Sequence, residues 1–311
     1  MGRERCKCVR GPILFLLPIG NEQLSACLKS ISSGGKAKRS YSPTTMTPPD
    51  PNASVVEVRT YFVRGRNAMI ARADFEPLFI DYYLHRADQG LEYSNELDHM
   101  LKDALAAMTL HLASRPQDES CGWTMNFHEP LLNLFVTGKS RPGAVTGRVF
   151  TEDVRDFGKN VLVAQITRPS LAPLQSMVEI SGPNVFASVE EYYQQSEQRT
   201  ARIFRLSDEV EDIVLLTAQP DCDEEWLKGL SVEDAKILDQ KEQLSLLETR
   251  PYIFHCGCSV ERLYPILAKL SEVDLDDVFA GDATVTLTCP RCGARYHTPK
   301  TQFLAWRVQQ G

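Results

Sequence analysis

Four cysteines near the C-terminus are the residues best suited to chemistry in this chain. Cys256 and Cys258 form a C-x-C pair, and about 30 residues later Cys289 and Cys292 form a C-x-x-C pair. Zinc binds thiolate sulfur at about 2.3 Å, so the sulfurs of a tetrahedral site lie roughly 3.8 Å apart. Residues this close in a turn reach that separation. The spacing therefore predicts that the reduced chain holds one zinc ion on these four cysteines.

The same spacing also allows thiol oxidation. Within each pair the two sulfurs are close enough to form a disulfide, and disulfide formation would expel zinc. A small C-terminal module has little core of its own, whereas structural zinc supplies roughly 10–16 kcal/mol of apparent folding free energy in small modules. Loss of zinc is therefore expected to unfold the module, which would make metal loss a conformational signal.

Other possible ligands are not needed for this site. His255 and His297 adjoin the two pairs, but four thiolates already complete a tetrahedral set. Nine cysteines is an odd number, which disfavours a complete disulfide framework. No role is assigned to the five remaining cysteines, which are Cys6, Cys8, Cys27, Cys121 and Cys222.

The segments around the cysteines suit a zinc knuckle. A strand is predicted at 252–254 and leads into the first pair, while strands at 284–288 and 295–297 flank the second pair. Gly293 follows the second pair and supplies the positive φ that such a turn often needs. We therefore expect residues 251–311 to form a C-terminal redox-switch zinc domain.

Helices are also expected in this domain. Ser259 can start a helix over 259–270, but Pro265 is expected to kink or restart it, because proline lacks a backbone donor. Residues 271–280 suggest another short helical piece.

Residues 55–206 predict an α+β core domain, in which a β-sheet packs against a few helices. The clearest helix covers 94–114, with Ser94 as its N-cap and apolar residues on one face. A later helix is expected to begin with a capping box of Ser188 and Glu191. A further helix is predicted at 75–86, and strands at 55–63, 69–74, 123–127, 131–137, 144–150, 160–167, 177–181, 202–206 and 212–218.

Residues 207–250 are rich in aspartate and glutamate, with apolar residues interleaved. This pattern predicts an acidic, amphipathic helical linker of marginal stability. A solvated helical connector without further function is the simpler interpretation, because such charge runs usually face solvent.

The first 54 residues are expected to lie outside the folded protein. Residues 28–54 are rich in serine, lysine, proline and threonine and show no apolar periodicity, which is typical of disorder. Met46 stands shortly before the first folded-looking segment, so the preceding residues read as an extension from a misplaced start codon. Residues 1–54 are thus interpreted as a disordered or mis-annotated extension.

Overall composition argues against several function classes. The net charge of −7 argues against binding to nucleic acid or anionic membrane through a basic face. The sequence contains no stretch of 18 or more apolar residues, so no transmembrane helix is predicted. A cytoplasmic protein is expected. The P-loop, G-x-S-x-G and H-E-x-x-H motifs are absent from the sequence, so no enzyme class is indicated.

The chain resembles the Hsp33 family of redox-regulated molecular chaperones. The C-x-C and C-x-x-C pairs have the spacing of the family's zinc pattern. Residues 190–198 (EEYYQQSEQ) and 213–220 (IVLLTAQP) are similar to its tyrosine-rich segment and to the strand that enters its linker. The sequence departs from the family at 127–130 (FHEP), where the family usually has a Gly-Asp-Gly-Pro turn.

The resemblance implies an ATP-independent holdase that is largely inactive while reduced and zinc-bound. Hypochlorite, or peroxide with heat, would form the Cys256–Cys258 and Cys289–Cys292 disulfides and release zinc. The C-terminal domain and linker would then unfold, and homodimers would bind unfolding client proteins. In that case the acidic linker has a function beyond that of a connector.

Two other function classes remain open at this stage. A constitutive zinc-stabilised interaction or nucleic-acid-binding protein is the first, because Arg291, Arg295, Lys300 and Arg307 place positive charge near the C-terminus. A thiol oxidoreductase is the second, but that class needs C-x-x-C at the start of a helix. Here the C-x-x-C pair lies in a predicted hairpin.

Overall fold

The computed structural model divides the chain into two compact units. Pro49–Cys256 form the larger unit, and Met1–Pro48 with Gly257–Gly311 form the smaller one. The expected extension over residues 1–54 falls almost wholly outside the described residues, so it stays a prediction. The structure describes residues 13–14, 53–207, 209–271, 275, 278–279 and 281–310.

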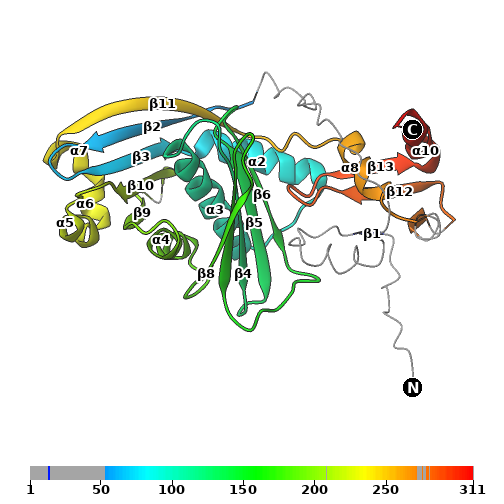
Figure 1. Cartoon of the computed structure of the whole chain (residues 1–311), viewed down its shortest axis with the longest axis horizontal. Coiled ribbons are helices and arrows are strands. Elements are labelled where there is room, and N and C mark those ends of the chain that lie inside the picture. Colours follow the sequence, from blue (N-terminus) through cyan, green and yellow to red (C-terminus); the bar gives the residue numbers. More distant parts are fainter. Residues whose placement is uncertain are drawn as a thin grey trace. The chain divides into compact units, whose positions relative to one another are not determined.

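A ten-stranded sheet forms the larger unit, in the order β8-β7-β4-β5-β6-β11-β2-β3-β10-β9 (Figure 1). Neighbouring strands are antiparallel, except β6 and β11, which pair in parallel. The predicted strands of the core are confirmed to within a few residues. The ten strands are β2 Val56–Val63, β3 Ala68–Asp74, β4 Ser120–Phe127, β5 Leu132–Lys139, β6 Ala144–Phe150, β7 Val161–Thr167, β8 Leu174–Glu179, β9 Ala201–Arg205, β10 Asp212–Ala218 and β11 Leu244–Phe254, of which β11 extends the strand predicted at 252–254.

The helix α3 (Asn95–Ala113) forms the centre of this unit and packs against strands from both halves of the sheet. Ser94 caps it as predicted, since its hydroxyl accepts a hydrogen bond from the Leu97 amide. The expectation of one apolar face was too narrow, because α3 is buried on nearly every side from Leu101 onward. The preceding helix α2 (Glu76–Gln89) confirms the helix predicted at 75–86.

The helix α4 (Val185–Gln195) begins earlier than predicted, and the capping box of Ser188 and Glu191 is wrong. Asn184 is the N-cap, and asparagine caps a helix as well as serine does. Ser188 lies one turn inside the helix, where its hydroxyl donates to the Asn184 carbonyl. The Glu191 carboxylate accepts hydrogen bonds from the Ser181 amide and hydroxyl instead.

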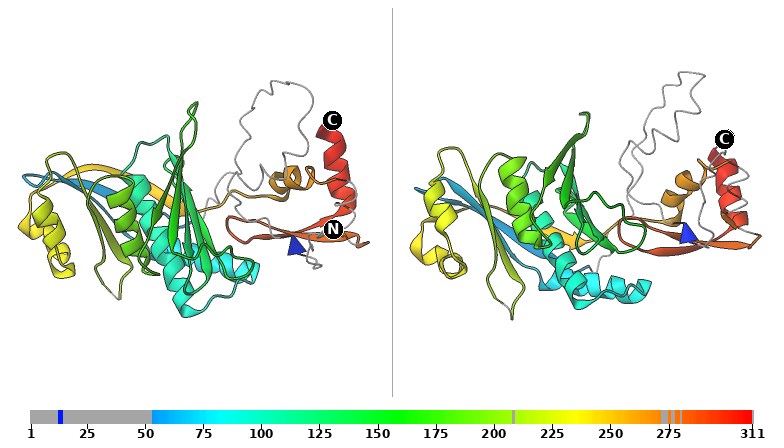
Figure 2. Two further views of the ribbon diagram at one scale, coloured as in Figure 1. Left: turned by 60° about the horizontal axis from the view of Figure 1, so that its bottom comes forward. Right: turned by 90° about the horizontal axis from the view of Figure 1, so that it is seen from below.

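The expected helical linker contains three short helices, α5 (Glu224–Gly229), α6 (Val232–Lys236) and α7 (Leu238–Lys241). These helices pack on one face of β2, β3, β9 and β10, and α3 packs on the opposite face (Figure 2). Successive residues of a strand point to opposite faces of the sheet, so the strands contribute to two separate apolar clusters. The expectation of helix is wrong for 244–250, which belong to β11 in the main sheet, whereas the strand predicted at 212–218 is confirmed as β10.

The smaller unit contains α8 (Val260–Leu267), the hairpin of β12 (Thr284–Thr288) and β13 (Arg295–Pro299), and α10 (Lys300–Gln310), with β1 (Ile13–Leu14) paired to β12. These bounds confirm the predicted hairpin. The sequence interpretation missed α10, although Phe303 contributes to the small core with Tyr264 and Leu287.

The restart expected at Pro265 is not found, because α8 continues through this residue and ends at Leu267. Proline near the end of a helix removes only one internal hydrogen bond, which explains the short continuation. The helical piece expected at 271–280 lies mostly outside the described residues. None of the described helices is long and apolar enough to cross a membrane.

A buried histidine makes the larger unit sensitive to acid. His111 on α3 is fully buried between Trp123, Tyr192 and Tyr193, and its Nδ1 lies 2.7 Å from the Tyr193 hydroxyl. Burial holds the pKa of His111 well below its usual range, and the nearby positive charge of Arg115 lowers it further. His111 is therefore neutral in the folded state and takes up a proton when the chain unfolds below about pH 6.5.

Unfolding then binds the extra proton, so the free energy of unfolding falls as pH falls, by up to about 1.4 kcal/mol per pH unit from this group. We expect His111→Gln to be less stable than the parent at pH 7.5 but to lose less stability between pH 7.5 and 5.5. Urea titrations at both pH values measure this. His99→Gln, at an exposed position on the same helix, is the control for the substitution of a histidine by glutamine. An equal slope in His111→Gln would contradict this account.

Candidate metal centre

Each cysteine pair is held by a tight turn at the end of a regular element. Cys256 follows the end of β11, and Cys258 precedes α8. Cys289 follows β12, where its amide donates to the Ala294 carbonyl at 2.7 Å. Gly293 closes the same turn, because its amide donates to the Cys289 carbonyl at 2.9 Å, and its φ of +78° confirms the predicted left-handed conformation.

The four predicted ligands come together in one cluster. The sulfur atoms of Cys256, Cys258, Cys289 and Cys292 all lie within 4.8 Å of one another, and Cys258 Sγ is 3.5 Å from Cys292 Sγ. Sulfurs around tetrahedral zinc lie roughly 3.8 Å apart, so the donor set and its spacing fit this metal. Cys289 and Cys292 are buried, whereas the C-x-C pair is partly exposed.

Neither neighbouring histidine belongs to the cluster within the described part of the chain. His297 Nδ1 lies 2.9 Å from the Thr286 hydroxyl across the hairpin, which accounts for its position on β13. The four-cysteine set is therefore the group that the geometry offers to a metal ion.

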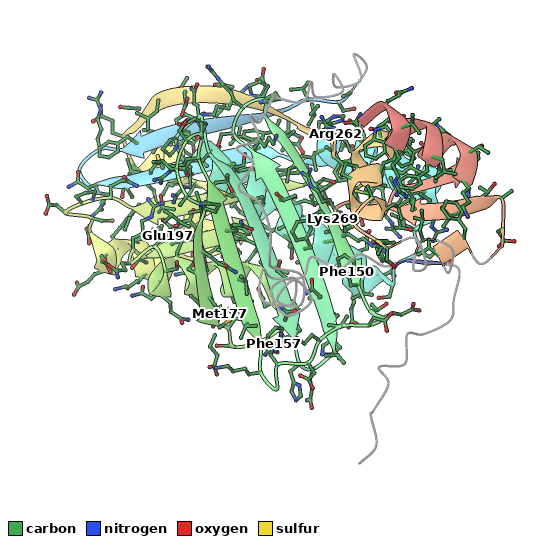
Figure 3. All side chains as sticks on the ribbon, turned by 45° about the vertical axis from the view of Figure 1, so that its right-hand side comes forward. Phe150, Phe157, Met177, Glu197, Arg262 and Lys269 are labelled. Atoms are coloured by element: carbon green, nitrogen blue, oxygen red, sulfur yellow. The ribbon has the colours of Figure 1, made fainter. Side chains whose placement is uncertain are left out.

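Two side chains outside the predicted set contact the C-x-C turn. Arg262, on α8 (Figure 3), donates to the Gly257 carbonyl at 2.5 Å. The Tyr296 hydroxyl on β13 lies 3.1 Å from both the sulfur and the carbonyl oxygen of Cys258. Burial, together with the hydrogen bond to Cys258, raises the pKa of Tyr296, so its hydroxyl remains protonated and can donate. Sequence reasoning missed both residues, although Arg262 and Tyr296 each stand four positions after a ligand cysteine.

The isolated cysteines are placed away from this cluster. Cys121 is buried in the core of the larger unit, and burial raises the pKa of its thiol to about 12. Burial also raises the pKa of Cys222, which lies at the start of the short helices. Both thiols are therefore protonated and poorly reactive near neutral pH. Cys6, Cys8 and Cys27 lie outside the described residues.

Comparison with known protein families matches residues 80–299 to the family described as Hsp33 protein. The chain belongs to the Hsp33 family. The match covers the strands of the main sheet from β4 onward, the three short helices and all four cysteines of the cluster. The resemblance inferred from the cysteine spacing is thereby confirmed.

Curated relatives carry the name 33 kDa chaperonin. The relative from Pasteurella multocida is 24% identical over 250 residues, which covers 70% of this chain and 87% of the relative. The relative from Methylobacillus flagellatus is 29% identical over 170 residues, which covers 48% of this chain and 54% of the relative. These matches support a chaperone function for this member of the family.

The fold agrees with a solved Hsp33 structure. The 33 kDa chaperonin (heat shock protein 33 homolog) from Thermotoga maritima superposes with a TM-score of 0.64 at 14% identity, covering 83% of this chain and 99% of that chain. The α+β class with a β-sheet core and a C-terminal cysteine module is thus confirmed. The departure at 127–130 remains a turn here, since residues 128–131 connect β4 to β5.

Metal analysis tests the cluster directly. We expect the reduced chain to bind one zinc ion, and Cys292→Ser to bind zinc far more weakly, because a hydroxyl is a poor replacement for a thiolate ligand. Zinc content after gel filtration, measured with a chromogenic chelator, gives the stoichiometry.

Cys222→Ser is the matched control, because it removes a thiol outside the cluster and should keep one zinc per chain. Equal zinc in Cys292→Ser and in the parent would contradict the assigned ligand set.

Proposed function

We propose that this chain is a redox-regulated, ATP-independent holdase whose switch is the four-cysteine cluster. In the reduced state Cys256, Cys258, Cys289 and Cys292 would hold one zinc ion as thiolates. Oxidation would join Cys256 to Cys258 and Cys289 to Cys292. The observation that carries the proposal is the gathering of four sulfurs within 4.8 Å in a member of a chaperone family.

The proposed oxidation balances within each cysteine pair. One thiolate attacks the chlorine of hypochlorous acid and releases hydroxide, and the second thiolate then attacks the chlorinated sulfur and releases chloride. Two thiolates and one hypochlorous acid thus give one disulfide, one chloride and one hydroxide. Sulfurs in a disulfide no longer serve as thiolate ligands, so the pairs lose zinc as they oxidise.

The smaller unit depends on its metal ligands, because its own core is small. Eight buried hydrophobic residues form its cluster in the described part of the chain, and a core of this size gives little stability. Cys256 and Cys258 on one side and Cys289 and Cys292 on the other would hold zinc together, and the bound ion would supply a cross-link between the C-x-C turn and the β12–β13 hairpin. Its loss would leave the hairpin and α8 without that cross-link, and we propose that residues 251–311 then unfold.

The acidic segment would unfold next, because its helices are too short to be stable on their own. The helices α5, α6 and α7 have six, five and four residues, whereas isolated helices below about 12 residues are marginal in water. They are held by Leu227, Leu230 and Leu238, which pack on the apolar face of the sheet. We propose that 207–250 act as a linker between a core at 55–206 and the switch, and that detachment of α5, α6 and α7 uncovers this face.

The partners follow from the proposed activity. An uncovered apolar face would bind unfolded or partly folded client proteins, and the oxidised chains would form homodimers. No ATP site, enzymatic reaction, nucleic acid or membrane is part of the proposed activity, and we propose a cytoplasmic location.

Treatment of the reduced chain with hypochlorite tests the proposal. We expect zinc release, formation of both disulfides, dimerisation and suppression of aggregation of a thermally unfolding client, in parallel with one another. Chelator absorbance, intact mass, sedimentation and light scattering measure the four changes. Zinc release without any gain in aggregation suppression would sink the proposal, whereas equal suppression with and without oxidant would indicate a constitutive zinc-stabilised binding protein.

A packing variant tests the proposed linker without oxidation. Leu227 is fully buried, so Leu227→Ala should weaken the contact of α5 with the sheet by about 2–5 kcal/mol. We expect the reduced variant to suppress client aggregation before any oxidant is added. Leu246→Ala, at a residue that is 59% exposed, is the control and should remain inactive while reduced. If Leu227→Ala stayed as inactive as the parent, these helices would not cover the client-binding surface.

A further inference from the structure

We propose that Tyr296 is a positioning residue that restrains the reactivity of Cys258 through a hydrogen bond from its phenol to the sulfur. The inference rests on the proposed function, because it concerns how readily the same switch is oxidised. Tyr296 lies outside the ligand set, and its hydrogen bond would set the oxidant concentration at which the Cys256–Cys258 pair reacts.

The phenol ring is held in place by its own strand and by the small core. Tyr296 pairs with Leu287 across the β12–β13 hairpin, and its ring packs against the apolar cluster of the smaller unit. Its hydroxyl contacts Cys258, which is 38 residues away in the sequence. The ring position is therefore set by the hairpin, independently of the C-x-C turn that the hydroxyl contacts.

One proton serves two acceptors on the same residue. The Tyr296 hydroxyl lies 3.1 Å from Cys258 Sγ and 3.1 Å from the Cys258 carbonyl oxygen. A thiolate carries a full charge and is the stronger acceptor, so the proton is directed to the sulfur in the reduced state. A sulfur in a disulfide is a weak acceptor, and the hydroxyl can then donate to the carbonyl oxygen. The hydrogen bond to sulfur is thus specific to the thiolate.

This hydrogen bond slows oxidation, because the lone pair that attacks the oxidant belongs to the sulfur atom that accepts the hydrogen bond. Attack on hypochlorous acid or peroxide uses a thiolate lone pair, and a donated proton withdraws charge from that atom. The partly exposed C-x-C pair has less protection from the surrounding chain than buried Cys289 and Cys292. Hydrogen bonds to metal ligands also tune the metal site.

The test compares two tyrosine-to-phenylalanine variants in the full chain. Tyr296→Phe removes the hydroxyl that contacts sulfur and keeps the ring. Tyr264→Phe is the matched control, because the Tyr264 hydroxyl makes a 2.7 Å hydrogen bond to Thr298 Oγ1 in the same unit. Both variants lose one hydroxyl and one hydrogen bond, but only the first loses a contact to a cysteine.

Replacement of zinc by cobalt reports the electron density on the sulfur ligands, through the sulfur-to-cobalt absorption bands. A more electron-rich sulfur gives up charge to the metal more easily, so we expect the sulfur-to-cobalt absorption bands of Tyr296→Phe to shift to longer wavelength. The rate of Cys256–Cys258 formation at a fixed peroxide concentration, measured by mass spectrometry, should rise about 3- to 10-fold. Tyr264→Phe should leave the band positions and the oxidation rate unchanged.

A second replacement keeps the test valid if Tyr296→Phe folds poorly. Substitution of 3-fluorotyrosine for Tyr296 retains the ring and provides a more acidic hydroxyl, which is a stronger donor. We expect the cobalt bands to shift to shorter wavelength and oxidation to slow. Opposite shifts in the two variants would identify the hydrogen bond as the cause.

The outcomes separate this inference from the proposed function. If Tyr296→Phe matched Tyr264→Phe in band positions and oxidation rate while the parent still released zinc and became a holdase, the role of Tyr296 would be overturned. If the parent bound metal but never became a holdase, the proposed function would fail. Shifted bands in Tyr296→Phe would then still support the hydrogen bond.

Discussion

Four sulfur atoms within 4.8 Å of one another are the constraint on which the C-terminal module depends. As thiolates they repel one another, and a small unit cannot hold four uncompensated negative charges together. A metal ion neutralises that repulsion, and disulfides remove the charges. Only metal binding would also tie the C-x-C turn to the hairpin, because each proposed disulfide would lie within one cysteine pair. The same residues can therefore stabilise the module or release it.

The larger unit provides the element through which such a change can act. The strand β11 begins three residues after α7, pairs with β2 and β6, and ends two residues before Cys256. The short helices and the first ligand thus stand at opposite ends of one strand. The acidic helices rest on a sheet face whose residues alternate with those that pack on α3. Detachment of the helices would leave α3 and its core intact while exposing the second face.

The sequence predicted the features that depend on local spacing. The hairpin around Gly293 and most strands follow from short patterns, and the structure confirms them. The four cysteines were predicted from a short pattern too and lie in one cluster, while their role as zinc ligands stays a prediction. The features that it missed depend on long-range contacts. Residues 244–250 continue an acidic, helix-prone segment in the sequence, but pairing with β2 makes them part of a strand. Tyr296 was overlooked because its contact with Cys258 spans 38 residues and leaves no local pattern.

Hydrogen–deuterium exchange on the reduced and the hypochlorite-treated chain tests the central claim most directly. If zinc and the four thiolates hold the module together, oxidation should abolish amide protection in α8 and the β12–β13 hairpin, and then in α5, α6 and α7. Protection in α3 and β4–β7 should persist, because their core contains none of the four cysteines. Full protection of the hairpin in a chain with both disulfides formed and zinc released would contradict the account.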